Sequence, residues 1–208
     1  EVRVRVHAAA LNHLDLFVAG GLPGVAYRFP HVVGADGAGV VDEVGTAVTA
    51  VRSGDRVMLN PGLSCGTCAE CRSGEESLCP AFQLLGEHRH GTMAEYVVVP
   101  EANLAPVPPA MPWATAAAFP LATLTAWRML LTRAQLAPGE TVLIWGIGGG
   151  VSQALLRIAR HLGATTIVTS GSDAKLAHAR ADGADHVVNH ATGDVVAAVR
   201  AATANRGA

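Results

Sequence analysis

The sequence has few charged residues, and it lacks a run of Lys and Arg. Asp, Glu, Lys and Arg make up 15% of its 208 residues, and the formal net charge is −2. A nucleic-acid-binding surface needs clustered basic side chains, so we expect no nucleic-acid partner. Half of the residues are hydrophobic, which is enough for the core of one large domain or two small ones.

Two further absences concern membranes and secretion. Residues 102–127 form the longest stretch without a charge, but it is interrupted by Pro106, Pro108, Pro109, Pro112 and Pro120. Proline removes backbone hydrogen bonds that a lipid bilayer cannot replace, so we predict no membrane span. No basic segment precedes an apolar run in the sequence shown. We therefore expect no signal peptide within it and a cytoplasmic protein.

The first half, residues 1–112, has the pattern of a β domain. Val2, Val4 and Val6 alternate with charged residues, which is the period-two signature of a half-buried strand. Short Val-rich runs punctuated by glycine follow, and they predict a small barrel-like domain. Because the alternating run starts at Glu1, we expect the sequence to be a piece of a longer protein.

A segment at about residues 60–90 has little hydrophobic periodicity but holds every cysteine of the chain: Cys65, Cys68, Cys71 and Cys79. Four thiolates so closely spaced can surround one tetrahedral Zn²⁺ and leave no position open for a substrate. Two disulfides in so short a segment would be strained, and no secretory signal accompanies them. Inert thiols and an iron–sulfur cluster are weaker alternatives. We therefore predict a lobe held by a structural zinc.

From residue 113 the pattern changes to alternating helices and strands. Ala- and Leu-rich helical spacing is followed by an apolar run at 141–146, which is typical of a strand buried on both faces. Further strands are expected at 165–170 and 186–190, and helices at 151–163, 172–183 and 194–203. This alternation predicts a parallel α/β sheet. A dinucleotide-binding sheet usually has about six strands, and since about three are visible here we expect truncation at the C-terminus.

A glycine cluster separates the strand at 141–146 from the next helix. Glycine lets a pyrophosphate approach the helix N-terminus, where free N–H groups and the helix dipole favour anions. Strict G-x-G-x-x-G spacing is not met, and a tight turn without a ligand is the alternative. The strand–loop–helix context still favours a dinucleotide site. The predicted cofactor-binding residues here are Gly146, Gly148, Gly149, Gly150 and Val151.

The end of the second strand bears on the choice of coenzyme. NAD-selective sites place a carboxylate there to bind the ribose 2′-hydroxyl, but this strand ends at Ser170, and the nearest carboxylate is Asp173. A hydroxyl tolerates a 2′-phosphate, and Lys175 follows one turn later. The plain alternative is that Ser170 only ends a strand and Lys175 is solvated. We predict NADP(H), with NAD(H) possible, and we add His190 at the end of the third strand as a further donor.

Six segments stand in an order and spacing that point to a known family: AAALNHLDLF, PHVVGADGAGVVDEVG, GDRV, PGLSCGTCAECRSGEESLCP, GTMAEYVVVP and PLATLTAW. In them the whole chain resembles the medium-chain dehydrogenases/reductases, the superfamily of zinc-containing alcohol dehydrogenases and quinone oxidoreductases. The resemblance implies a GroES-like domain at 1–112, whose cysteine lobe holds structural zinc, and a Rossmann NAD(P)-binding domain at 113–208. It also implies an active site in the cleft between these domains, a small-molecule carbonyl or alcohol substrate, and a homodimer or homotetramer.

The sequence departs from the family's alcohol dehydrogenases where they bind catalytic zinc. By resemblance, those enzymes place Cys at the position of Asn12, and His and Glu at Ala35 and Asp36. Another Cys falls near Leu121. Because Asn and Ala are poor zinc ligands, we predict that the catalytic zinc is absent. The Asn-x-x-Asp spacing of Asn12 and Asp15 resembles that of the zinc-independent quinone and enone reductases.

An unusual catalytic metal site is an alternative, with possible ligands His13, His31, Asp36, Glu87, His88 and His90. A polar surface loop, or groups around the cleft, is the simpler interpretation of these residues.

We expect an NAD(P)H-dependent oxidoreductase that reduces an enone- or quinone-type carbonyl without catalytic zinc. The coenzyme would supply hydride, and the protein would bind the developing enolate oxygen. By resemblance, the predicted catalytic residues are Asn12, Asp36 and Thr125. A zinc-dependent alcohol dehydrogenase with unconventional ligands and a non-catalytic NADPH-binding protein are the alternatives.

Overall fold

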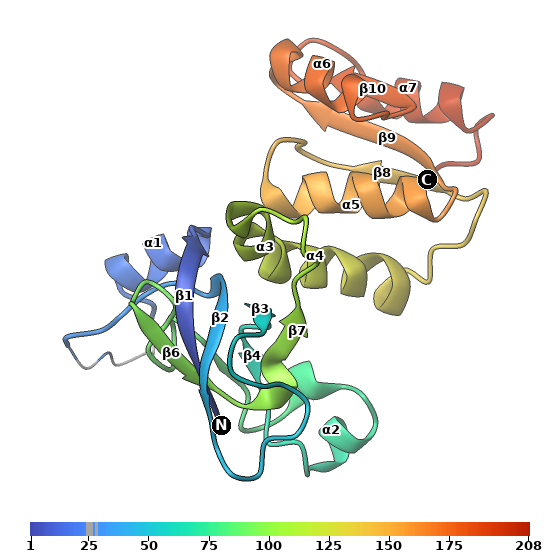
Figure 1. Ribbon diagram of the computed structural model, residues 1–208. Coiled ribbons are helices and arrows are strands. Elements are labelled where there is room, and N and C mark those ends of the chain that lie inside the picture. The colour runs from blue at the N-terminus through green and yellow to red at the C-terminus, as the bar shows by residue number, and fades with distance from the viewer. Residues whose placement is uncertain (24–26, 28) are drawn as a thin grey trace. The chain divides into compact units, whose positions relative to one another are not determined.

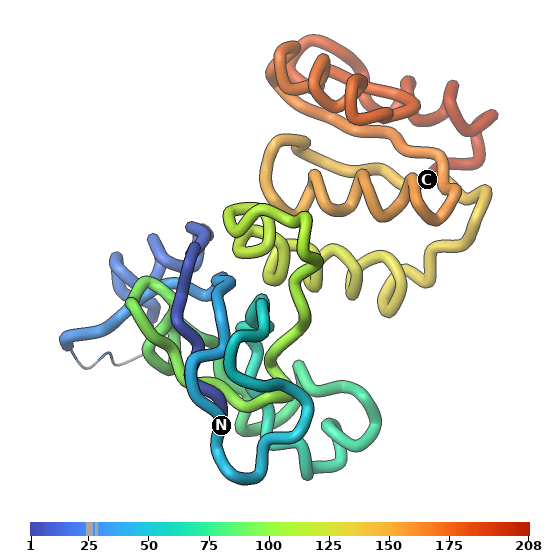
Figure 2. Tube along the Cα trace, in the orientation of Figure 1, coloured from blue at the N-terminus to red at the C-terminus, as the bar shows by residue number. Residues whose placement is uncertain are grey.

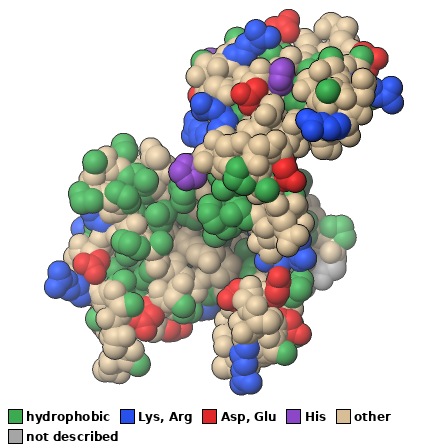
Figure 3. All heavy atoms as spheres, turned by 90° about the vertical axis from the view of Figure 1, so that its right-hand side faces the viewer, with side chains coloured by type: hydrophobic (Ala, Val, Ile, Leu, Met, Phe, Trp, Pro, Cys, Tyr) green, Lys and Arg blue, Asp and Glu red, His purple; other side chains and the backbone are tan. Residues whose placement is uncertain are grey.

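The chain forms two compact units, Glu1–Leu121 and Ala122–Ala208, in a computed structural model that describes residues 1–23, 27 and 29–208 (Figure 1). Each unit has a hydrophobic core of its own. In the part of the chain so described, no helix combines the length and the apolar character needed to cross a bilayer. On the face drawn in Figure 3, Lys and Arg side chains stand in separate small groups and not in one continuous patch.

An antiparallel five-stranded sheet, in the order β6-β1-β2-β3-β7, forms the first unit. Its strands are β1 (Val2–Ala10), β2 (Asp36–Val44), β3 (Arg56–Leu59), β6 (Tyr96–Val99) and β7 (Leu104–Pro106). The trace in Figure 2 shows β1, at the blue end of the chain, beside the much later green strand β6, where Val2 pairs with Val99. As the alternating pattern predicts, Val2 and Val4 are fully buried and Arg3 is exposed.

Helix α3 (Trp113–Ala118) covers part of this sheet by packing on β1 and β2. Ala116 and Ala117 are fully buried there against Ala38. Their small side chains let the helix lie close to the strands. A second cluster, rich in valine, fills the interior among the strands, and each buried valine contributes roughly 1.5–3 kcal/mol relative to exposure.

Shorter elements complete the first unit: α1 (His13–Gly20), β4 (Gly62–Leu63), α2 (Ala69–Arg72), β5 (Gln83–Leu84) and 3-10 turns at Glu76–Leu78 and Glu101–Asn103. β4 and β5 flank the cysteines in the sequence and pair with each other as a separate antiparallel ladder. The cysteine segment is therefore closed at its base by backbone hydrogen bonds.

The Ala- and Leu-rich segment after residue 112 forms three helical pieces in a row. α3 ends before Phe119, and α4 (Pro120–Trp127) begins at Pro120. Proline suits this first helical position because its missing N–H needs no partner there. A π-helical piece, Arg128–Arg133, follows.

The second unit is a parallel sheet in the order β10-β9-β8. Its elements are β8 (Thr141–Ile144), α5 (Gly150–His161), β9 (Thr165–Ser170), α6 (Asp173–Ala181), β10 (His186–Asn189) and α7 (Val195–Ala202). α5 packs on β8 and β9, α6 packs on β9 and β10, and α7 contacts β10. The predicted α/β class, a β domain followed by a parallel sheet, is confirmed.

Candidate functional site

The four cysteines of the lobe converge on one point. Their Sγ atoms all lie within 4.8 Å of one another, with 3.4 Å between Cys68 and Cys71 and 3.9 Å between Cys65 and Cys71. Four sulfurs at about 2.3 Å from a tetrahedral Zn²⁺ lie about 3.8 Å apart, so the set fits zinc. Among the described residues, no other group of three or more His, Cys, Asp and Glu side chains is arranged to hold a metal.

Backbone N–H groups already favour one thiolate in this cluster. Thr67 N and Cys68 N donate to Cys65 Sγ at 3.5 and 3.4 Å, and these bonds lower the pKa of Cys65 to about 6. Cys71 N likewise donates to Cys68 Sγ, but burial and the neighbouring thiols outweigh that bond and raise the pKa of Cys68 to about 12. Such a cluster cannot ionise fully by itself, and a bound cation would complete the ionisation.

Asn12, Asp36 and Leu121 are joined by the two oxygens of one carboxylate. Asn12 Nδ2 donates to Asp36 Oδ2 at 2.9 Å, and Leu121 N donates to Asp36 Oδ1 at 2.8 Å. Asp36 is buried at the start of β2, and Asn12 is half-buried at the N-cap of α1. The positions that the resemblance assigns to a catalytic zinc thus hold a hydrogen-bonded network of amide, carboxylate and backbone.

A second buried carboxylate fixes the backbone around this network. Asp15, in the first turn of α1, accepts hydrogen bonds from Asn12 N at 2.7 Å and Gly34 N at 2.8 Å. Burial raises the pKa of Asp36, and the charge of Asp15 adds to this, whereas the hydrogen bonds from Asn12 and Leu121 lower it; the net direction is upward. Sequence reasoning assigned Asn12 and Asp36 a catalytic role only through the resemblance.

The histidines proposed as alternative metal ligands bond to the backbone instead. The contacts are His31 Nε2 to Gly86 O at 3.0 Å, His90 Nδ1 to Val32 N at 3.2 Å and His88 Nδ1 to Leu84 N at 3.2 Å. The rings of His31 and His90 lie 5.5 Å apart, and His13 faces Phe17. These histidines form no metal cluster with Asp36 or Glu87 within the described residues. His31, His88 and His90 thus hold loop backbone, and His13 lies in α1.

The glycine cluster forms the loop between β8 and α5. Gly146 and Gly148 have φ of 77° and 128°, a region that side chains rarely adopt. Ser152 Oγ, in the first turn of α5, accepts hydrogen bonds from Gly148 N and Gly149 N, both at 3.2 Å. Sequence reasoning missed Ser152, although a hydroxyl in the first turn of a helix is a known signal for backbone bonding.

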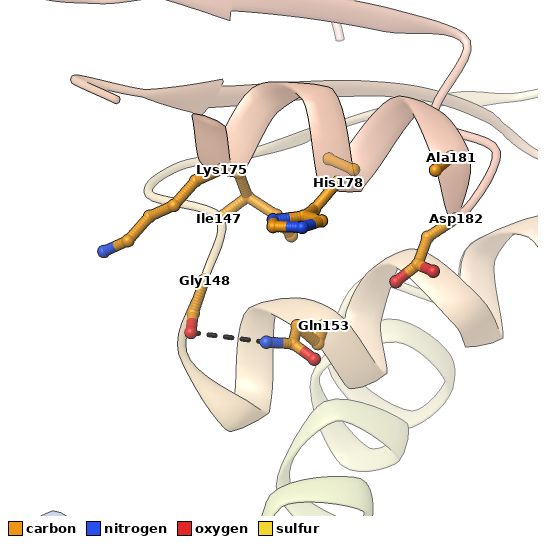
Figure 4. A pocket seen from close by; sticks show the side chains of 8 residues that line it. Ile147, Gly148, Gln153, Lys175, His178, Ala181 and Asp182 are labelled. Atoms are coloured by element: carbon orange, nitrogen blue, oxygen red, sulfur yellow. Dashed lines mark hydrogen bonds between the residues drawn. The ribbon is translucent and has the colours of Figure 1, made fainter. Parts of the chain in front are cut away.

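A cavity of about 390 Å³ lies between this loop and α6, lined by Ile147, Gly148, Gln153, Lys175, His178 and Asp182 together with two alanines. Figure 4 shows Lys175 extending from α6 toward the loop, and Gln153 donating to Gly148 O. A Cβ at Gly148 would lie 2.9 Å from Lys175 Cδ. The bare glycine backbone, the start of a helix and a cation fit a phosphate-bearing dinucleotide. Gln153 and His178 escaped sequence reasoning.

Of the other residues predicted to bind the coenzyme, Gly150 and Val151 begin α5, and Ser170 and His190 lie at or just after the carboxyl ends of β9 and β10. Ser170 is buried, with 4% of its surface exposed, and its Oγ accepts a hydrogen bond from Ser172 N. The ring of His190 stacks on Trp145, which is exposed. Thr125 is exposed on α4 in the second unit, whereas Asn12 and Asp36 belong to the first.

Known proteins match the chain along its whole length. Residues 1–109 match the alcohol dehydrogenase GroES-like domain, and residues 150–208 match the zinc-binding dehydrogenase family. A zinc-type alcohol dehydrogenase-like protein of Schizosaccharomyces pombe is 35% identical over 192 residues, which are 91% of this chain and 54% of that protein. An NAD-dependent alcohol dehydrogenase of Sulfurisphaera tokodaii is 32% identical over 216 residues, 100% of this chain and 62% of that protein.

A solved structure, the crystal structure of an NAD-dependent alcohol dehydrogenase, has a TM-score of 0.95 at 53% sequence identity and covers 100% of this chain and 60% of its own. The chain thus spans between 54% and 62% of the length of these relatives. The two family matches follow each other in the order that the motifs predict. The chain belongs to the zinc-containing medium-chain dehydrogenase/reductase superfamily, with the alcohol dehydrogenase GroES-like domain first and the zinc-binding dehydrogenase domain second.

Proposed function

We propose that the protein is an NAD(P)H-dependent oxidoreductase that reduces an enone- or quinone-type carbonyl, with one structural zinc on its four cysteines and no catalytic zinc. The observation that carries this proposal is the network of Asn12, Asp36 and Leu121. Both oxygens of the Asp36 carboxylate accept hydrogen bonds from protein donors. A metal at this position would have to break those bonds and would gain amide and aliphatic neighbours in place of Cys and His.

The chemistry follows from the hydrogens of the Asn12 amide. Its Nδ2 carries two hydrogens, and one is donated to Asp36. The second can point toward the oxygen of a conjugated carbonyl, where negative charge develops during reduction. Asp36 acts as a positioning residue, since its buried charge orients the amide. When bound, the reduced nicotinamide supplies the hydride, and a proton from water completes the product, which is the saturated carbonyl for an enone and the hydroquinone for a quinone. Thr125 is proposed by resemblance as a further contact.

For the coenzyme we propose NADP(H), with NAD(H) as the alternative that the names of the relatives favour. The nearest carboxylate, Asp173, accepts a hydrogen bond from Asn189 Nδ2 at 2.7 Å. Lys175 lies beside Gly148 in the cavity. Lys175 thus offers a cation beside the glycine loop, and the Asp173 carboxylate is already bonded to Asn189.

Alcohol dehydrogenation with a catalytic metal is the second candidate, because relatives carry the name alcohol dehydrogenase. Zinc content and turnover of the full-length protein decide between the two. We expect one zinc per chain, oxidation of NADPH with a cyclic enone or a quinone, and no reduction of NADP⁺ or NAD⁺ by a primary alcohol. Two zinc ions and alcohol turnover would establish the second candidate. Coenzyme binding without any turnover would indicate a non-catalytic NADPH-binding protein.

The domain limits 1–112 and 113–208, an assembly of two or four copies and a cytoplasmic location stay predictions from the sequence and the resemblance. Light scattering of the full-length protein would test the assembly, and subcellular fractionation would test the location.

A further inference from the structure

Side chains at the ends of the three strands of the second unit are joined in a row. Thr169, in β9, is fully buried, and its Oγ1 accepts a hydrogen bond from Gly146 N at 3.0 Å. His190 follows β10, and its Nδ1 lies 3.3 Å from Thr169 Oγ1. Trp145 follows β8, and its ring stacks on the imidazole with centroids 5.2 Å apart and planes inclined by 5°. Stacking on the Trp145 indole therefore fixes the plane of the imidazole, and the Thr169 hydroxyl contacts its Nδ1.

The hydroxyl hydrogen of Thr169 decides which nitrogen of His190 carries the proton. A threonine hydroxyl offers one hydrogen and two lone pairs, and Gly146 N occupies one lone pair. A buried hydroxyl hydrogen needs an acceptor, and His190 Nδ1 stands at hydrogen-bond distance. A neutral imidazole that accepts at Nδ1 carries its proton on Nε2.

The Nε2 edge of His190 lies over the turn that follows β9. A Cβ placed on Gly171 would be 3.3 Å from His190 Nε2, and His190 N donates to Ser170 O at 3.1 Å. In a dinucleotide-binding sheet, the end of the second strand is where the 2′ position of the adenosine ribose is recognised. Ser170 Oγ is engaged by Ser172 N and lies in a buried side chain. His190 is exposed at the same turn.

We propose that Thr169 holds His190 as its Nε2–H tautomer, and that this N–H is the donor that recognises the oxygen at the 2′ position of the coenzyme's adenosine. The inference rests on the proposed function in so far as the protein must bind a dinucleotide. His190 is then a binding residue, and Thr169 is a positioning residue. A neutral N–H can donate to a ribose hydroxyl as well as to a phosphate, so His190 contributes to the binding of both coenzymes. We assign the preference between the two coenzymes to Lys175, the cation beside Gly148.

The tautomer is measured without any coenzyme. Nitrogen-15 NMR of the full-length protein with labelled histidine, at about pH 8 and so above the ordinary histidine pKa of about 6.5, distinguishes a protonated from an unprotonated ring nitrogen. The His190→Gln spectrum identifies the His190 signals. We expect the proton on Nε2 in the wild type and in Thr169→Ser, and a mixture of tautomers in Thr169→Val. A wild-type proton on Nδ1, or no change in Thr169→Val, would overturn the role of Thr169.

The recognition step is measured by titration with three probes: 5′-AMP, 2′,5′-ADP and 2′-deoxy-AMP. His190→Phe keeps a ring against Trp145 and removes the donor. We expect it to weaken 5′-AMP and 2′,5′-ADP about five- to tenfold, the size of one hydrogen bond, and to leave 2′-deoxy-AMP unchanged. His190→Gln, with an amide N–H near the position of Nε2, should recover most of the affinity. Thr169→Val should weaken the first two probes, and Thr169→Ser should match the wild type.

Failure of the inference and failure of the proposed function give different results. If the wild type binds NADPH and NADH, but His190→Phe binds all three probes as the wild type does, His190 recognises no ribose oxygen and the inference alone is wrong. If the wild type binds neither coenzyme, the proposed function is wrong and the inference falls with it.

Discussion

Asn12 Nδ2 and Asp36 Oδ2 lie 2.9 Å apart, and they join the N-cap of α1 to the first residue of β2. The other oxygen of Asp36 accepts a hydrogen bond from Leu121 N. Asp36→Ala would leave both donors without this acceptor, and each such loss costs about 1–3 kcal/mol. We expect the free energy of unfolding to fall by about 2–6 kcal/mol in urea titrations. Asp36→Asn keeps one acceptor, so its free energy of unfolding should fall less than that of Asp36→Ala. An unchanged urea midpoint in Asp36→Ala would contradict the network.

The raised pKa of Asp36 predicts how stability changes with pH. A carboxyl whose folded pKa is above its unfolded value binds its proton more tightly in the folded protein, so it favours folding at low pH. This contribution is lost as pH rises from the unfolded pKa through the folded one. The stability difference of wild type minus Asp36→Asn should therefore grow on acidification. Urea unfolding of both proteins at several pH values across the carboxyl range measures it, and a difference that shrinks on acidification would refute the raised pKa.

The features that the sequence predicts best are those built from neighbouring residues. The four cysteines lie within one short segment, so their spacing alone indicates a common ligand, and their Sγ atoms do converge. The glycine loop lies directly between a strand and a helix, and the sequence patterns that predict this strand and this helix lie within a few residues of the loop. Local spacing and composition are enough to predict both the cysteine cluster and the glycine loop.

Contacts between distant residues could not be predicted in this way. Asp36 and Leu121 are 85 residues apart, and no periodicity indicates that a backbone N–H of α4 bonds to that carboxylate. Ser170 stands at the tip of a strand, as the pattern predicts, but no pattern indicates that its Oγ accepts a hydrogen bond from Ser172 N or that its side chain is buried. Such contacts depend on how the chain packs, whereas a sequence pattern indicates only which residues are close together along the chain.

Replacement of Cys71 tests the zinc lobe. Cys71→Ser removes one thiolate from a set of four, so we expect loss of the metal and a lower melting temperature, since binding energy of a structural zinc contributes to folding. NADPH affinity should change little, because the coenzyme residues lie in the other unit. Zinc content and thermal unfolding are measured together. The control is Ser73→Ala, whose exposed hydroxyl donates to Glu70 O. Full zinc and unchanged melting in Cys71→Ser would show that this assignment is wrong.

Lys175 and Ser170 test the coenzyme preference. Lys175→Met keeps the aliphatic stem beside Gly148 and removes the charge, so NADPH should bind about tenfold more weakly, roughly 1.4 kcal/mol, with NADH little affected. Ser170→Asp should reverse the preference, because a carboxylate repels a 2′-phosphate and can bind a ribose hydroxyl. Calorimetric titration of both coenzymes measures this. Equal or tighter NADH binding by the wild type would refute the NADP(H) preference.

Ser152 tests how the glycine loop is prepared for a pyrophosphate. Its Oγ accepts from Gly148 N and Gly149 N and donates to Gly149 O at 3.0 Å, so it fixes a loop whose glycines would otherwise be free to move. A loop held in one conformation has less entropy to lose on binding. Ser152→Ala should therefore weaken NADH, NADPH and ADP-ribose by a similar factor of about three to ten, within the range for one or two hydrogen bonds. Ser152→Thr keeps the hydroxyl and should bind all three ligands as the wild type does. The opposite outcome has its own meaning: tighter binding by Ser152→Ala would show that the hydroxyl competes with the pyrophosphate for the two N–H groups.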